Sequence, residues 1–170
     1  MRVALVRHLL SITALPFVVV VVVPVWISRR YAVDIDFAHI GVIPGIVGAA
    51  LIAIGLFFFA WSLRRFAADG EGTLAPWDPP RKLVVVGPYR FVRNPMISGV
   101  VIMLFGEAAL WQSLPHVGWA ATFLALNLVY IPLMEEPMLR ARFGAPYDEY
   151  RRHVPGLIPR LTAWTPGTGD

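Results

Sequence analysis

Long runs of residues without charge restrict what this sequence can fold into. The run from Leu9 to Ser28 has no ionisable side chain and includes six consecutive valines. A helix needs about 20 predominantly apolar residues to cross the hydrocarbon core of a bilayer. A lone strand cannot satisfy its backbone hydrogen bonds in lipid, so a spanning helix is predicted despite the valines. A cleaved signal peptide is the alternative, but the run is long for one and lacks a clear cleavage site before Arg29.

Two further apolar segments follow the first. Ile40 to Leu63 is predicted to be the second span, and its Gly45 and Gly48 would let another helix approach closely. Asn94 to Met134 has only two ionisable positions and is long enough for two short helices, with a turn near residues 112–116. The sequence therefore predicts an all-α integral membrane protein with about four transmembrane helices, of which the last two form a helical hairpin.

Glu107 and His116 are the two ionisable residues within the predicted hairpin. A carboxylate is costly in lipid, so Glu107 is predicted to face protein, a polar cavity or the membrane surface. It either contacts a substrate or locks helices together, or it simply lies near the surface because its helix is short or tilted. The four histidines of the chain are scattered and do not have metal-ligand spacing, so no metal site is predicted.

The composition agrees with a membrane protein formed as one domain over residues 1–170. Hydrophobic residues make up 57% and charged residues 15% of the chain, whereas a soluble domain is about a quarter charged. The absence of cysteine excludes disulfides, cysteine zinc sites and a cysteine nucleophile. Four spans with both termini cytoplasmic leave only Arg29 and Arg30, of 15 basic residues, on the outer side. The basic residues therefore indicate topology in an inner membrane, with membrane lipids rather than nucleic acid as their partners.

Two polar blocks fall on the same cytoplasmic side in this topology. Residues 87–99 read GPYRFVRNPMISG, and residues 135–159 read EEPMLRARFGAPYDEYRRHVPGLIP. In the first, Asn94 suits an N-cap and Pro95 the first position of a helix. The positive end of that helix, with Arg93 beside it, would suit an anion, and Glu135 with Glu136 would suit a cation. An amino-acid-like ligand would match these poles, although paired charges at a membrane surface are also common without a ligand.

The second block is predicted to form an amphipathic helix from Glu135 to Val154, interrupted at Gly144. Its apolar side is formed by Leu139, Phe143, Tyr147 and Tyr150, and its polar side, facing water or headgroups, by Arg140, Arg142, Arg151 and Arg152. A loose end is predicted from Thr162 onward.

The two blocks resemble those of the isoprenylcysteine carboxyl methyltransferase family, which is related to the membrane phospholipid methyltransferases. The shared residues of the first block are Gly87, Pro88, Tyr89, Arg93, Asn94, Pro95 and Gly99. Those of the second are Glu135, Glu136, Leu139, Phe143, Gly144, Tyr147, Tyr150, Val154, Pro155, Ile158 and Pro159. The resemblance makes residues 76–160 a cofactor-binding core, with an N-terminal two-helix part at 1–75 and a tail at 161–170.

The resemblance implies a membrane-embedded methyltransferase that uses S-adenosylmethionine. Its acceptor would be a lipophilic small molecule or a prenyl- or lipid-like compound, with methylation of a carboxylate oxygen favoured. The implied cofactor-binding residues are Tyr89, Arg93, Asn94, Pro95, Met96, Gly99, Glu135 and Glu136. The candidate catalytic residues are Arg93, Arg140 and Tyr147, and the candidate substrate contacts are Glu107 and Tyr150.

Two departures from the family's pattern bear on the acceptor. Asn94 stands where the enzymes that methylate prenylcysteine have His, and Ile97 where they usually have Tyr, which favours another lipophilic acceptor. Two other functions stay open. One is a membrane reductase of lipids or sterols using NADPH, although a set of residues for its phosphates is not evident. The other is a non-catalytic scaffold protein that has lost cofactor binding.

Overall fold

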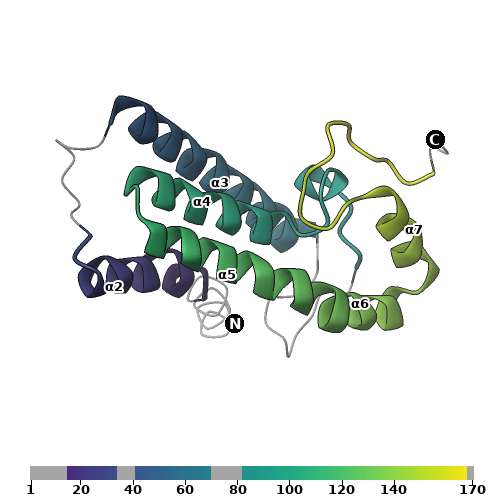
Figure 1. Cartoon of the computed structure of the whole chain (residues 1–170). Helices are drawn as coiled ribbons and strands as arrows, with labels where there is room; N and C mark the ends of the chain where they lie inside the picture. Colours follow the sequence, from purple (N-terminus) through teal and green to yellow (C-terminus); the bar gives the residue numbers. More distant parts are fainter. Residues whose placement is uncertain (1–14, 34–40, 70–81, 168–170) are drawn as a thin grey trace, which may run out of the picture.

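The computed structural model of the chain describes residues 15–33, 41–69 and 82–167 (Figure 1). These residues form helices, and no strand occurs among them, which confirms the all-α class. In chain order the elements are η1 (Val18–Val22), α2 (Val23–Arg30), α3 (Val42–Asp69), η2 (Gly87–Arg90), α4 (Pro95–Leu110), α5 (Leu114–Tyr130), η3 (Ile131–Glu135), α6 (Glu136–Phe143) and α7 (Ala145–His153). The beginning of the predicted first span, and residues 70–81 of the polar segment before the first block, lie outside the described residues.

Among the residues that the structure describes, two helices are long and apolar enough to cross a membrane. They are Val42–Ala68 and the continuous helix Leu114–Phe143, which α5, η3 and α6 form together. Only 11% of the most apolar window of each is buried within the protein, so neither resembles the enclosed core helix of a soluble domain. The apolar helix α4 has 16 residues and a length of about 24 Å, shorter than the roughly 30 Å hydrocarbon core. The number of four spans stays a prediction.

Helices α3 and α4 pack against each other, antiparallel, through two pairs of glycines. Gly48 lies against Gly106, and Gly55 lies against Gly99. A Cβ atom on Gly55 would stand 2.5 Å from the carbonyl oxygen of Gly99, and one on Gly106 would stand 2.9 Å from that of Gly48. Helices in lipid associate closely where small residues face each other. The close approach predicted at Gly48 is therefore confirmed, and α4 supplies the partner glycines.

A tight turn joins α4 to α5 at Trp111–Ser113, which confirms the predicted helical hairpin. The buried ring of His116 ties this turn to α2. Its Nε2 donates to the carbonyl oxygen of Pro24 at 3.2 Å, so its Nδ1 accepts from the hydroxyl of Ser113 at 2.8 Å. The hydroxyl of Ser28 also lies 3.3 Å from Nε2. His116 is thus fully engaged in holding helices together.

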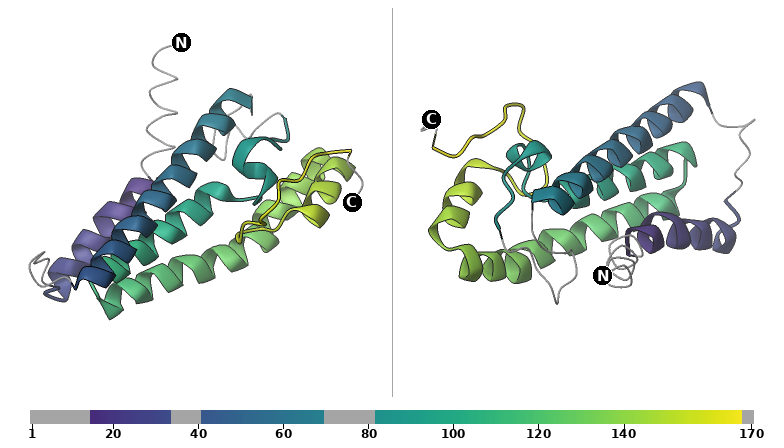
Figure 2. Two further views of the ribbon diagram at one scale, coloured as in Figure 1. Left: turned by 90° about the horizontal axis from the view of Figure 1, so that it is seen from above. Right: turned by 180° about the vertical axis from the view of Figure 1, so that it is seen from behind.

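The chain stays helical past the predicted end of the last span at Met134. Pro132 lacks the N–H that an α-helix would use, and the helix passes it in the wider π-helical turn η3. The predicted interruption at Gly144 is confirmed, since its φ is +60° and α7 starts directly after it. Figure 2 shows α7 and the C-terminal segment at the same end of the bundle as η2 and the start of α4.

Residues 154–164, called the strap below, cross over the first polar block. Four backbone hydrogen bonds attach the strap to this block. They are Arg93 N–H to Pro155 O (2.8 Å), Asn94 N–H to Gly156 O (3.0 Å), Arg160 N–H to Phe91 O (2.9 Å) and Trp164 N–H to Arg90 O (3.0 Å).

The end of the strap is fixed by Trp164, where the sequence predicts a loose end. The Trp164 side chain is 3% exposed, its ring is stacked on that of His153, and it also contacts Tyr150. The Nε of Arg90 donates to the Trp164 carbonyl oxygen at 2.7 Å. An aromatic side chain of this size gains from burial, so the chain is held at least as far as this residue.

Candidate active site

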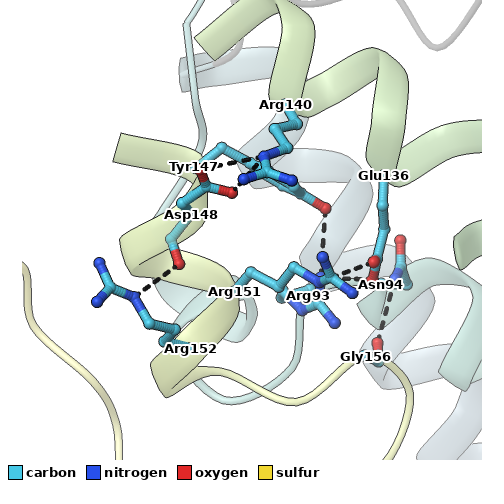
Figure 3. Close-up of polar contacts among 9 residues, drawn as sticks. All are labelled: Arg93, Asn94, Glu136, Arg140, Tyr147, Asp148, Arg151, Arg152 and Gly156. Carbon is cyan, nitrogen blue, oxygen red and sulfur yellow. Dashed lines mark hydrogen bonds and ion pairs between the residues drawn. The ribbon is translucent and has the colours of Figure 1, made fainter. Parts of the chain in front are cut away.

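A buried ion pair joins the two polar blocks. Arg93 lies just before α4, and its Nη1 is 2.6 Å from Oε1 of Glu136, the first residue of α6 (Figure 3). The two side chains are 11% and 7% exposed, so the pair is largely removed from water. The other oxygen of Glu136, Oε2, pairs with Nε of Arg151 on α7 at 2.9 Å. Both oxygens of the Glu136 carboxylate are therefore occupied by guanidinium groups.

Tyr147 on α7 completes this cluster. Its hydroxyl accepts a hydrogen bond from Nη1 of Arg93 at 3.2 Å. Burial raises the pKa of Tyr147, and the nearby charge of Glu136 adds to this while Arg93 opposes it. The phenol therefore stays neutral at physiological pH and keeps its proton for donation.

Two polar groups at the cluster are left available. The Nε of Arg93 is buried and has no hydrogen-bond partner within the described part of the chain. Glu135, next to Glu136, makes no ion pair or hydrogen bond among the residues that the structure describes. A buried polar group without a partner costs roughly 1–3 kcal/mol, and native proteins accept this cost where a ligand or water completes the contact. The cluster thus offers one buried donor and one carboxylate to a ligand.

The start of α4 differs from the prediction in its hydrogen bonds. Asn94 and Pro95 do occupy the N-cap and first helical positions, but the Asn94 side chain does not cap the helix. Its amide instead donates to the carbonyl oxygen of Gly156 in the strap at 3.2 Å. The backbone N–H groups of Arg93 and Asn94 also bond to the strap. The strap takes both N–H groups because its carbonyls lie directly against them, and the suitability of the positive end of α4 for an anion stays a prediction.

Tyr89, Met96 and Tyr150 support the cluster from one side. Tyr89 is buried with Phe66 and Val84, and Met96 packs against this group. The Tyr150 hydroxyl donates to the carbonyl oxygen of Tyr89 at 2.6 Å, so its polar atom is used within the fold. Burial raises the pKa of both tyrosines.

Three candidate residues lie away from the cluster. Gly99 packs on Gly55 of α3, which accounts for its small size. Glu107 is 12 residues after Pro95 on α4, about 18 Å along the helix and close to its other end. Arg140 is at the surface, where its Nε pairs with the Asp148 carboxylate at 3.0 Å and its side chain is 62% exposed.

Arg151 and Ser98 belong to the site region, but the sequence did not single them out. Arg151 is predicted to face water or headgroups, and its side chain is indeed 48% exposed, but its Nε also pairs with Glu136. The signal was present in the spacing, because Arg151 is four residues after Tyr147 and shares its side of α7. Ser98 donates to the carbonyl oxygen of Leu157 at 2.7 Å and so binds the strap to the first turn of α4.

The phospholipid methyltransferase family matches residues 43–146, more than half of the chain. The chain belongs to this family. The match contains the whole first block and the start of the second, including Arg93, Glu135 and Glu136, so the resemblance to this group of membrane methyltransferases is confirmed as far as residue 146. Together with the two long apolar helices, it identifies a membrane protein of a methyltransferase family.

A curated relative gives a second comparison. Methanethiol S-methyltransferase 2 of Bradyrhizobium diazoefficiens is 36% identical over 75 residues. The matched residues cover 44% of this chain and 28% of that relative, so the chain corresponds to only a part of it. No solved structure matches the chain.

Proposed function

We propose that this chain is a membrane methyltransferase that takes its methyl group from S-adenosylmethionine and transfers it to a lipophilic small molecule or lipid-like acceptor. The observation that carries the proposal is the buried Arg93–Glu136 pair. Beside it, Arg93 Nε has no hydrogen-bond partner, and the Glu135 carboxylate makes no ion pair or hydrogen bond, among the described residues. Membership of the phospholipid methyltransferase family supports it.

The two available groups fit the amino-acid end of this cofactor. Glu135 would bind the ammonium group, because both oxygens of Glu136 are already paired with arginines. Arg93 would bind the carboxylate through its free Nε, since guanidinium groups suit carboxylates. The Arg93 side chain is only 11% exposed, and electrostatic contacts are stronger where water is largely excluded. The bound cofactor would supply an electrophilic methyl group on a sulfonium.

The neighbouring residues would position these groups rather than react. Glu136 and Tyr147 fix the guanidinium of Arg93, and Arg151 fixes Glu136 from the other side. The strap bonds to the Asn94 side chain and thereby fixes the backbone just before α4. Preorganised groups of this kind lower the entropy that is lost when reactants are aligned.

The acceptor could present oxygen or sulfur. A carboxylate is already ionised at neutral pH and needs to be positioned by a cation, so carboxylate methylation is the first candidate. Arg140 is one of several exposed arginines, and it suits that task because its partner among the described residues, Asp148, is itself partly exposed. A thiol is the second candidate, because the curated relative is named as an S-methyltransferase. A thiol has a pKa of about 8.5 and must lose its proton first.

Equilibrium binding to the detergent-purified protein tests the cofactor. We expect S-adenosylmethionine to bind and NADPH not to bind. Glu135→Gln should lose most of this affinity and keep the unfolding temperature of the wild type, while Arg142→Gln, a control at an exposed arginine outside the site, should keep both. Binding of NADPH alone would indicate a reductase, and binding of neither to folded protein would indicate a non-catalytic scaffold. Undiminished binding by Glu135→Gln would refute the assignment of the ammonium site.

Transfer of a labelled methyl group then identifies the acceptor. A prenylated carboxylic acid and methanethiol should be offered in parallel to the same protein in bilayers. Methylation of the acid would support oxygen transfer, and methylation of the thiol alone would show that the chain shares the activity for which its relative is named.

A further inference from the structure

Two large apolar side chains of the strap are exposed although the strap itself is firmly held. Ile158 is 81% exposed and Leu161 is 99% exposed. The strap is bound to the first block on both sides of Ile158, through Gly156 and Arg160. These side chains are therefore held outward by an ordered backbone, whereas apolar side chains in a loose tail would be free to turn inward.

Part of the strap lies beside the apolar segments of α3 and α4 rather than beyond their polar ends. The carbonyl oxygen of Leu157 accepts from Ser98 in the first turn of α4. The next residue, Gly99, lies against α3, where an added Cβ would stand 2.9 Å from the backbone nitrogen of Phe59. Phe59 is five residues before Arg64, about 7 Å along the helix from the first charge that ends the apolar stretch. Along the axis of α3, Leu157 and Ile158 therefore lie on the apolar side of Arg64.

The charged group of the strap points away from this apolar stretch. The Arg160 guanidinium donates to the carbonyl oxygen of His153 at the end of α7 and to the hydroxyl of Thr162. Arg152 is an exposed cation on α7, which leads directly into the strap, and Arg142 is an exposed cation on the preceding helix α6. Apolar side chains beside exposed arginines are the usual composition of a segment that lies in the membrane interface.

We propose that the strap is a membrane-interface segment whose Ile158 and Leu161 side chains insert among the lipid chains, with the neighbouring arginines at the headgroups. The partner of this surface is the bilayer itself. The strap also bonds to Arg93 and Asn94, so the same segment contacts lipid on one side and the candidate active site on the other. This inference needs the membrane location of the chain and does not depend on the identity of the cofactor.

The absence of cysteine from the chain allows a direct test. Single-cysteine variants Ile158→Cys and Leu161→Cys, and the control Glu149→Cys on the exposed side of α7, are labelled with an environment-sensitive fluorophore. Each full-length protein is placed in nanodiscs of phosphatidylcholine and phosphatidylglycerol. We expect emission at 158 and 161 to shift to shorter wavelength and to be quenched when the lipid chains carry bromine. The label at 149 should show neither change.

Either of two results would overturn the proposal. One is emission at 158 and 161 that matches the control and is not quenched by brominated lipid. The other is a shift that depends on the number of protein copies per disc, which would assign the surface to a second copy of the chain. All three positions are exposed, so an unfolding temperature equal to that of the wild type verifies that each labelled protein is folded.

Discussion

Substitution of Gly55 by alanine tests the helix packing that positions the site. The added Cβ would stand 2.5 Å from Gly99 O, 2.6 Å from the Met103 Cγ and 2.8 Å from the Met103 backbone nitrogen. Two of these atoms belong to the backbone of α4, so the contact can be relieved only by moving the helices apart. Overpacking of this kind costs roughly 1–3 kcal/mol, and the better helix propensity of alanine returns about 0.5–1 kcal/mol. We expect a net loss of about 1–2 kcal/mol.

Thermal unfolding in detergent, followed by the fluorescence of the six tryptophans, measures this loss. A change of 1 kcal/mol moves the midpoint by about 2–4 °C in a chain of this length, so Gly55→Ala should lower it by roughly 2–8 °C. Gly118→Ala is the matched control, because nothing lies within 4 Å of its added Cβ. Gly118→Ala therefore has only the gain in helix propensity, about 0.5–1 kcal/mol, and its unfolding midpoint should rise slightly.

The reasoning is refuted if Gly55→Ala behaves like Gly118→Ala. Gly99→Ala extends the test, since its Cβ would meet the Gly55 carbonyl oxygen at 2.7 Å. We expect Gly99→Ala to lower the midpoint while the folded fraction binds the cofactor as before. A selective loss of cofactor affinity at an unchanged midpoint would instead place Gly99 in the cofactor pocket.

Three further predictions follow from the site and the strap. Burial raises the pKa of Tyr89 and Tyr150 above the ordinary value of about 10, so the stability that they confer is complete below about pH 10 and is lost as the pH rises further. In an alkaline absorbance titration, their phenolates should appear only with unfolding, and their appearance in the folded protein would contradict this. Arg140→Ala breaks only an exposed ion pair and should change the free energy of unfolding by at most about 1 kcal/mol in chemical denaturation, and a larger loss would show a deeper role. Trp164→Ala should free the strap and speed hydrogen exchange of the backbone amides that bond to it, and unchanged protection would show that Trp164 does not hold the strap.

Local patterns in the sequence were sufficient to predict the helices and to predict that the two polar blocks lie together. Apolar length predicts the hairpin, and Gly144 predicts the break before α7, because both depend on neighbouring residues. The glycine pairs could also have been found, since Gly48 and Gly55 on α3 and Gly99 and Gly106 on α4 each lie seven residues apart on one helix face.

The contacts of the strap could not be predicted from local patterns. The Asn94 amide bonds to a carbonyl 62 residues away, and Arg90 bonds to one 74 residues away. Backbone carbonyls are the same in every residue, so the sequence carries no mark of which one will accept such a bond. For the same reason the sequence predicts that the Asn94 side chain caps α4. The tertiary structure shows that this side chain bonds to Gly156 of the strap instead.

The π-helical turn η3 changes the rotation of α6 about the helix axis relative to α5, and so sets the direction in which the side chains of α6 point. Such a turn holds one residue more than the α-helical turn it replaces, and each residue rotates a helix by about 100°. Deleting one of residues 131–134 would leave every side chain assigned to the site in the chain, yet it would rotate α6 and carry the Glu136 carboxylate away from Arg93. The alignment of the two blocks therefore depends on the residue count of a segment that itself faces mostly outward.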